Sequence, residues 1–256
     1  IEAFEEIRRW IYCNARPLEL ALWQYQFEHG SKEAVLSVLM NYQNEDGGFG
    51  TAVEPDNWNP ESTPYTASFV IRILRQIGFV NTEHPIYQGI FRFLENTPYK
   101  ANYGWFFVVQ SNEHYPHARW WDYNEEDNRH QSIGITAILS GFILRYGDKT
   151  SALYRRAFEY AKRLLETLPA TVHFGDMGIK GHCELWRDLE EAGLLQELPC
   201  TGVQEKLQEL VRNKINREKD NFMANPLEFV LSPDSRYYEE YKLEVESALD
   251  RLLDQR

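Results

Sequence analysis

The clearest structural signal in this chain lies in ten consecutive residues, Asn41-Tyr42-Gln43-Asn44-Glu45-Asp46-Gly47-Gly48-Phe49-Gly50. Residues 33–43 carry apolar side chains at helical spacing, which predicts a helix that ends at the glutamine. The Asp-Gly-Gly sequence that follows predicts a tight turn, because glycine tolerates a positive φ angle. We expect Phe49 to fold back under the helix end, and the Gln43 amide to tie the turn by bonding exposed backbone groups.

Beyond this stretch, apolar residues recur with helical periodicity along most of the chain. One-sided helices with charged opposite faces are predicted at residues 33–43, 86–95, 153–168, 203–215 and 241–253. Helices that are apolar on nearly every side are predicted at residues 65–77, 133–146 and 183–192. The alternation fits two concentric layers, with inner helices packed on one another and outer helices around them. An irregular helical bundle is the alternative explanation.

The ends of the all-round apolar helices carry recognisable signals. Ser62-Thr63-Pro64 predicts a helix start, because a capping hydroxyl precedes a proline in the first turn. Gln131 or Ser132 is expected to open the second of these helices. The three helices are each expected to stop at a glycine, which accepts the left-handed conformation after a helix: Gly78, Gly147 and Gly193.

The stretch 43–50 and the helix before it resemble the repeat of squalene–hopene cyclases and protein prenyltransferase β subunits. In that repeat an outer helix ends in Gln, followed by Asp-Gly, then Gly or Ser, then Trp or Phe. The chain is also similar to bacterial proteins described as prenyltransferase-like, a label that records the repeat and not an activity. The resemblance implies an all-α fold of the α/α-toroid type, in which inner helices ring a central cavity.

The resemblance also implies how the chain is organised. We expect residues 1–256 to form a single α/α-toroid domain that is incomplete or truncated at its C-terminal end. The reason is that residues 247–255 align with 36–43, and the chain stops where the Asp-Gly-aromatic turn is due. A final repeat is therefore expected beyond Arg256.

Composition favours a globular protein and argues against several kinds of partner. The formal net charge is −12 and no Lys/Arg run is present, so we expect neither nucleic acid nor an anionic membrane surface as partner. No stretch approaches the ~18–20 apolar residues of a membrane span. Three widely spaced cysteines and an acidic, amphipathic first segment favour a reducing, cytoplasmic location over a secreted one.

Polar and aromatic residues gather in three segments that lead into the all-round apolar helices, at 53–60, 102–130 and 173–184. In an array of helical hairpins such segments fall at one end, where they can wall a small-molecule pocket. The candidate catalytic residues are Glu54, Asp56 and Asp127. The candidate substrate-binding residues are Trp58, Tyr103, Trp105, His117, Arg119, Trp120, Trp121, His130 and His182.

Each candidate group has a structural alternative. Glu54 and Asp56 can cap turns beside proline and asparagine. The segment 102–130 is long for a loop, which indicates either a functional segment or a plug that seals the core. The arginines at positions 119, 129 and 187 can receive a diphosphate or carboxylate, or pair with local acids.

Three groups have the residue types of metal ligands, and the sequence alone assigns no metal or cofactor to any of them. His114 and His117 have the spacing of loop ligands, yet such a pair is often structural. Glu125-Glu126-Asp127 can bind Mg²⁺ or Ca²⁺, or form a solvated acidic turn. His182-Cys183-Glu184 can offer soft ligands, although Cys183 also suits a small buried position.

The catalytic motifs of the resembled families are missing from this chain. It contains no Asp-X-Asp-Asp element of the cyclases, no Asp-X-Cys zinc element of the prenyltransferases and no Asp-Asp-X-X-Asp element. The resemblance therefore implies a fold and transfers no catalytic centre.

Three functions stay open on the sequence. The first is binding or transformation of an isoprenoid or lipid-like molecule in an aromatic cavity, where ring faces stabilise positive charge. The second is a carbohydrate-active α/α barrel that uses paired acids and exposed tryptophans. The third is a non-catalytic scaffold that binds a peptide or protein. We expect a small-molecule ligand, and the oligomeric state is open.

Overall fold

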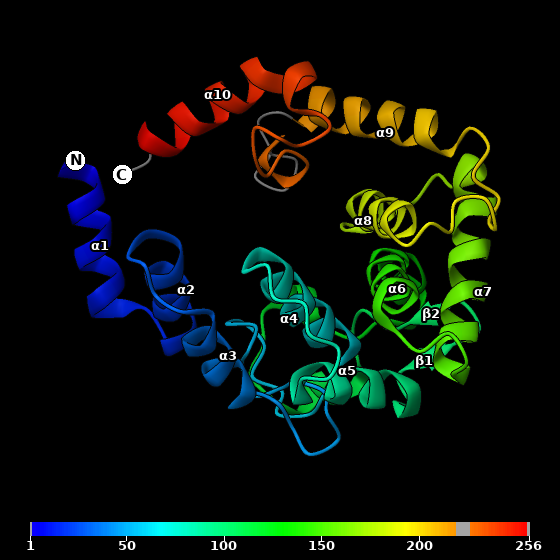
Figure 1. The fold of residues 1–256 in the computed structure, drawn as a ribbon, viewed down its shortest axis with the longest axis horizontal. Coiled ribbons are helices and arrows are strands. Elements are labelled where there is room, and N and C mark those ends of the chain that lie inside the picture. The colour runs from blue at the N-terminus through cyan, green and yellow to red at the C-terminus, as the bar shows by residue number, and fades with distance from the viewer. Residues whose placement is uncertain (1, 219–225, 255–256) are drawn as a thin grey trace. The chain divides into compact units, whose positions relative to one another are not determined.

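A computed structural model describes residues 2–218 and 226–254 of the chain, and this part is mainly helical (Figure 1). The predicted all-α class is confirmed, since the described strands are the two short partners of one antiparallel hairpin, β1 (Lys100–Ala101) and β2 (Gly104–Trp105). The helices are α1 (Glu2–Asn14), α2 (Pro17–Phe27), α3 (Lys32–Met40), α4 (Pro64–Gln76), α5 (Pro85–Asn96), α6 (Glu125–Tyr146), α7 (Ala152–Thr167), α8 (Gly178–Glu191), α9 (Val203–Glu218) and α10 (Tyr238–Asp254). The described helices include none that is long and apolar enough to cross a membrane.

Residue contacts divide the chain into two compact units. The first contains the chain up to Asn128 together with residues 151–153, and the second contains residues 129–150 and the chain after residue 153. The first unit has its core among α3, α4 and α5, which contribute fully buried Leu39, Ile71 and Ile90. In the second unit, a Cβ on Gly181 of α8 would lie 2.8 Å from the Cα of Gly134 in α6. Glycine at both positions therefore lets these two helices approach backbone to backbone.

The turn after α3 has the predicted construction. The Gln43 side-chain amide donates to the backbone oxygen of Gly47 at 2.9 Å and to that of Ile86 at 3.2 Å. Gly47 has a φ of 93°, which explains the glycine there. Phe49 is fully buried, as expected for an aromatic that packs under the helix end. The glutamine thus ties its own turn and also fastens it to α5.

The start of α4 is also as predicted. Thr63 is the N-cap, and its hydroxyl accepts a hydrogen bond from the backbone N–H of Thr66 at 3.1 Å. Pro64 follows in the first turn. Most of α4 is buried, but Tyr65, Phe69 and Arg72 follow one another at intervals of four and three residues and are only half-buried. The helix therefore keeps one face that is open to further contacts.

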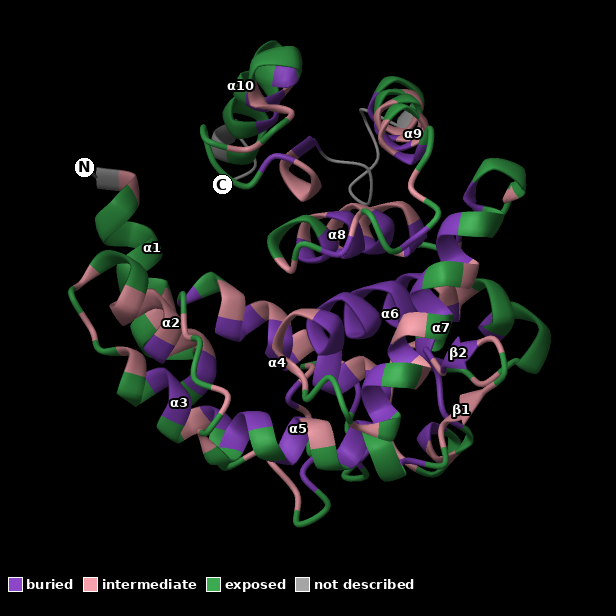
Figure 2. Ribbon diagram, turned by 45° about the vertical axis from the view of Figure 1, so that its right-hand side comes forward, coloured by how far each residue is buried: buried purple, intermediate pink, exposed green. Residues whose placement is uncertain are grey.

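Two predicted helix starts are too late. α6 begins at Glu125, eight residues before the predicted 133, and α8 begins at Gly178 instead of 183. The side-chain oxygen of Asn124 accepts hydrogen bonds from the backbone of Glu126 and Asp127, so it caps α6. The acidic triplet 125–127 is the first turn of this helix, where negative charge is stabilised by the helix dipole. Residues 134–144 of α6 are buried on all sides, as predicted (Figure 2).

The segment 102–130 is ordered and is not an open loop. It contains β2, the first turns of α6 and two 3-10 helices, η1 (Gln110–His114) and η2 (Arg119–Trp121). At the other end of the first unit, helices α1 and α2 occupy residues to which periodicity assigned no helix.

Candidate functional site

The loop between α3 and α4 holds its backbone in an unusual conformation. Thr51 and Ala52 have φ angles of 53° and 58°, in the left-handed region that disfavours residues with a Cβ. The guanidinium of Arg16 binds the backbone oxygens of Ala52 and Val53, and the Thr51 N–H donates to the Asn59 oxygen at 2.9 Å. Such strain persists where surrounding contacts enforce it, and it is concentrated at functional sites. Glu54 and Asp56 follow directly on this braced loop.

Glu54 lies against the open face of α4. The Tyr65 hydroxyl donates to its Oε2 at 3.3 Å. Burial, and then the neighbouring Asp56 carboxylate, raise the pKa of Glu54, while Arg72 and the Tyr65 hydroxyl oppose the shift. Burial also raises the pKa of Tyr65, so its hydroxyl remains a donor. Glu54 is therefore a carboxyl group that keeps its proton to higher pH than a solvated glutamate.

Asp56 is held by the segment that precedes α6. Its Oδ1 accepts a hydrogen bond from the indole Nε1 of Trp121 at 2.8 Å, and its backbone oxygen accepts one from Ala118 N–H at 2.9 Å. Trp121 stacks on Phe107 with ring centroids 5.4 Å apart and meets the Tyr65 ring edge-on at 4.4 Å. These aromatic rings adjoin both carboxyl groups, so the first unit brings the predicted Glu54, Asp56 and Trp121 together.

Arg72 lies two turns along α4 from Tyr65, on the same face. Its guanidinium is close enough to oppose the pKa shifts of both Tyr65 and Glu54. Its Nε is buried and has no hydrogen-bond partner in the described structure. An unsatisfied buried donor is costly.

His117 lies on the same loop as Trp121 and is joined to the α3–α4 loop by a β-bridge to Asn57. Its Nδ1 is 2.6 Å from the Tyr115 backbone oxygen and its Nε2 is 3.0 Å from Asp122 Oδ1. Burial lowers the pKa of His117, but the Tyr115 oxygen and the Asp122 and Glu113 carboxylates outweigh it, so the net shift is upward.

The other aromatic candidates occupy different environments. Trp58 and Trp120 are exposed, by 62% and 65%. Arg119 is exposed as well, and half-buried Tyr103 stacks on Phe106. Trp105 is fully buried, with its indole N–H directed at the Leu94 backbone oxygen at 3.4 Å. Trp58 is therefore an exposed indole on the loop that carries Glu54 and Asp56, whereas Trp105 is part of the core.

The remaining candidates are one acid of the first unit and two histidines of the second. Asp127 is exposed in the first turn of α6 and, in the described structure, makes no hydrogen bond with Glu54 or Asp56. His130 and His182 belong to the second unit. His130 is exposed and its ring lies edge-on to that of His173, while His182 is buried with Nδ1 2.7 Å from the Gly178 oxygen. The structure thus gathers Glu54 and Asp56 but not Asp127.

Sequence reasoning missed several residues of this site. Tyr65 and Arg72 are partners of Glu54, and Glu113 and Asp122 flank His117. A charged residue within a largely apolar helix was the available signal for Arg72, because such a charge needs a partner. Asp122 carried no local signal.

Comparison of the chain with protein-family models, curated proteins and solved structures found no match. The likeness to the cyclase and prenyltransferase repeat therefore rests on the residues around 43–50. The geometry described above carries the argument about function.

Proposed function

We propose that the amino end of α4 binds a small isoprenoid or lipid-like molecule, and that Glu54 donates a proton to it. The observation that carries this proposal is the carboxyl group of Glu54, whose pKa is raised by burial beside an aromatic cluster. A carboxyl that retains its proton is a general acid, and such a group contributes roughly 10²–10⁴-fold to a rate.

The surroundings of Glu54 suit the product of such a proton transfer. When the carboxyl O–H bond breaks and the proton joins one carbon of an alkene, the other carbon becomes a cation and Glu54 becomes a carboxylate. The faces of Tyr65 and Trp121 favour a nearby cation, and the Asp56 carboxylate adds a compensating charge. Arg72 and the Tyr65 hydroxyl are placed to stabilise the carboxylate form of Glu54 after the transfer.

We also propose the α/α-toroid arrangement for the helical hairpins. The Gln43 turn supports this arrangement, because hydrogen bonds fasten it to α5, the next outer helix. Such repeats need a connection of this kind between neighbouring outer helices. Most of α4 and residues 134–144 of α6 are buried, which is compatible with inner helices at both positions. The described cysteines are free thiols, which is compatible with the proposed cytoplasmic location.

A sugar ligand is the second candidate, and one observation favours it. Trp58 exposes 62% of its surface on the loop that carries Glu54 and Asp56. An exposed indole beside paired acids suits stacking on a sugar ring and acid–base cleavage of a glycosidic bond. The two candidates differ in the atom that receives the proton, carbon or oxygen.

Deuterium incorporation distinguishes these reactions. The purified chain is incubated in D₂O with geranylgeraniol or squalene as probe, and the recovered hydrocarbon is analysed by mass spectrometry. We expect the wild-type chain to incorporate deuterium at carbon. The rate of incorporation should fall by about 10²-fold or more in Glu54→Gln, because the amide cannot donate the proton.

The control is Asp127→Asn, which removes an exposed acid outside the pair. It should incorporate deuterium at the wild-type rate. Incorporation that is unchanged in Glu54→Gln contradicts the proposal. Absence of incorporation together with hydrolysis of aryl glycosides favours the sugar candidate instead.

A further inference from the structure

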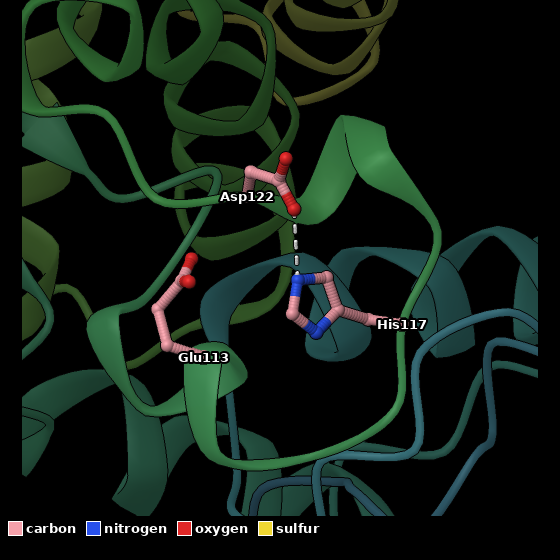
Figure 3. A group of neighbouring side chains, drawn as sticks. All are labelled: Glu113, His117 and Asp122. Carbon is pink, nitrogen blue, oxygen red and sulfur yellow. Dashed lines mark hydrogen bonds and ion pairs between the residues drawn. The ribbon is translucent and has the colours of Figure 1, made fainter.

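Three side chains on the loop before α6 converge although their backbone positions span ten residues. Glu113, His117 and Asp122 each turn a ligand atom toward a common space, and these atoms all lie within 4.8 Å of one another (Figure 3). The first belongs to η1, the second is the bridged residue of the loop and the third directly follows η2. The candidate acid site uses none of these three side chains.

The hydrogen bonds of His117 fix which ring nitrogen faces the carboxylates. A backbone oxygen only accepts, so the 2.6 Å contact with Tyr115 requires Nδ1 to carry a hydrogen. In a neutral imidazole, Nε2 then presents its lone pair to Asp122 Oδ1 at 3.0 Å, and a lone pair facing a carboxylate is repulsive. A positive charge at Nε2, either a proton or a metal ion, stabilises this arrangement.

The remaining contacts match those of a metal-bound histidine. Histidine ligands regularly donate their second ring N–H to a backbone oxygen or carboxylate, which fixes the ring and the tautomer. The Tyr115 oxygen performs this role for His117. Glu113 is oriented in the same way, because its Oε1 accepts the backbone N–H of Tyr123 at 2.6 Å and its second oxygen stays available.

The loop is held in place by groups other than these three side chains. Buried Asn112, next to Glu113, directs its side-chain amide to the Trp121 backbone oxygen at 3.3 Å. The Asn59 side chain donates to Asn112 at 2.8 Å. The backbone N–H of Trp58 donates to the backbone oxygen of Pro116, the residue before His117, at 3.0 Å. A scaffold of this kind keeps the ligand atoms near one another before any ion binds.

We propose that Glu113, His117 and Asp122 bind a divalent transition-metal cation, with Zn²⁺ as the best match. One imidazole and two carboxylates suit zinc, whereas Mg²⁺ and Ca²⁺ prefer oxygen ligands alone. Ligand bonds of ~2.1 Å in a tetrahedral site place donor atoms about 3.4 Å apart, a separation between the 3.0 Å of the His117–Asp122 pair and the 4.8 Å limit of the group. Glu113 and Asp122 are exposed, which leaves room for water at the fourth position.

Titration of the full chain with Zn²⁺, monitored by calorimetry, tests this site. Co²⁺ serves as a spectroscopic probe of the same site. We expect one equivalent of Zn²⁺ to bind and one equivalent of Co²⁺ to give the visible absorption of a tetrahedral complex. Removing a residue that hydrogen-bonds to a metal ligand weakens metal binding by about 10–100-fold. Removing a ligand itself, as in His117→Gln or Asp122→Asn, should therefore weaken Zn²⁺ binding by at least ~100-fold.

The matched control is His114→Gln, because His114 is an exposed histidine three residues before His117 and lies outside the converging group. It should bind Zn²⁺ like the wild type. Glu113→Gln is a second ligand variant that can still accept the Tyr123 N–H, so the loop should remain folded. Its Zn²⁺ affinity should also fall by at least ~100-fold.

Two results would overturn the proposal. One is absence of Zn²⁺ and Co²⁺ binding by the wild-type chain, which would assign the positive charge at Nε2 to a proton. The other is binding that persists in His117→Gln, Asp122→Asn and Glu113→Gln while falling in His114→Gln or elsewhere. Neither readout depends on catalytic activity, so this test is independent of the proposed function.

Discussion

The turn after α3 predicts an unusual coupling between Gln43 and Gly89. Gly89 lies in α5, and a Cβ added there would collide with the amide nitrogen of Gln43. Gly89→Ala should therefore displace the glutamine from the oxygens of Gly47 and Ile86. In a Gln43→Ala background the nearest remaining atom is the Gly47 Cα at 3.2 Å, so most of the collision is removed.

The magnitudes follow from the two hydrogen bonds. Each contributes about 0.5–1.5 kcal/mol net, so Gln43→Ala should lower the free energy of unfolding by about 1–3 kcal/mol. Gly89→Ala loses the same bonds but gains about 0.5–1 kcal/mol of helix propensity. In the double variant only the propensity gain is added to the cost of Gln43→Ala. The two changes should thus be coupled by about 1–3 kcal/mol, with the double variant more stable than additivity predicts.

Urea denaturation of the four proteins measures this coupling from the unfolding midpoints and slopes. Additive effects, within about 0.5 kcal/mol, would refute the described turn. Gln43→Glu is a second check. It keeps the shape of the side chain but places a carboxylate, which cannot donate, against the two backbone oxygens. It should be less stable than Gln43→Ala, and the reverse order would show that the donor role is wrong.

Three further changes test other parts of the structure. Thr63→Ala removes the N-cap of α4 and should lower the free energy of unfolding by about 0.5–2 kcal/mol in urea denaturation, so an unchanged midpoint would contradict the cap. Burial lowers the pKa of His182, so the unfolded chain binds a proton there that the folded chain excludes, and stability should fall as the pH drops below about 6.5. The slope of stability against pH between 5 and 7 should be smaller in His182→Gln, and equal slopes would count against a neutral buried imidazole. Trp121→Phe and Asp56→Ala should be coupled by about 1–3 kcal/mol in a double-mutant cycle of urea unfolding, since either one removes the 2.8 Å hydrogen bond, and additive losses would contradict that bond.

Local sequence signals predicted the local structure well. The Gln43 turn was predictable because the bond from Gln43 to the Gly47 oxygen lies within a few residues, whereas the bonds with Ile86 and Arg92 of α5 come from a distant helix and gave no local signal. The start of α4 was predictable because Thr63 and Pro64 act on the turn that they begin. The start of α6 was not, because its polar first turn lacks apolar periodicity and the capping role of Asn124 went unrecognised.

The candidate site was predictable only in part, for a physical reason. Glu54 and Asp56 attract attention as acids on a loop, but their partners lie far along the chain. Trp121 is 65 residues from Asp56, and spacing gives no information on such a contact. Residue type also fails to separate a core tryptophan such as Trp105 from an exposed one such as Trp58.

The most direct test of the proposed site is a pH titration of Glu54, monitored by ¹³C NMR of side-chain-labelled glutamate. The Glu54 signal is assigned by its absence in Glu54→Gln. Burial and the neighbouring Asp56 carboxylate predict a pKa above the ordinary value of glutamate, and a downward shift of that pKa in Asp56→Asn. A Glu54 pKa at or below the ordinary value, unmoved by Asp56→Asn, would contradict the account of Glu54 as a proton donor.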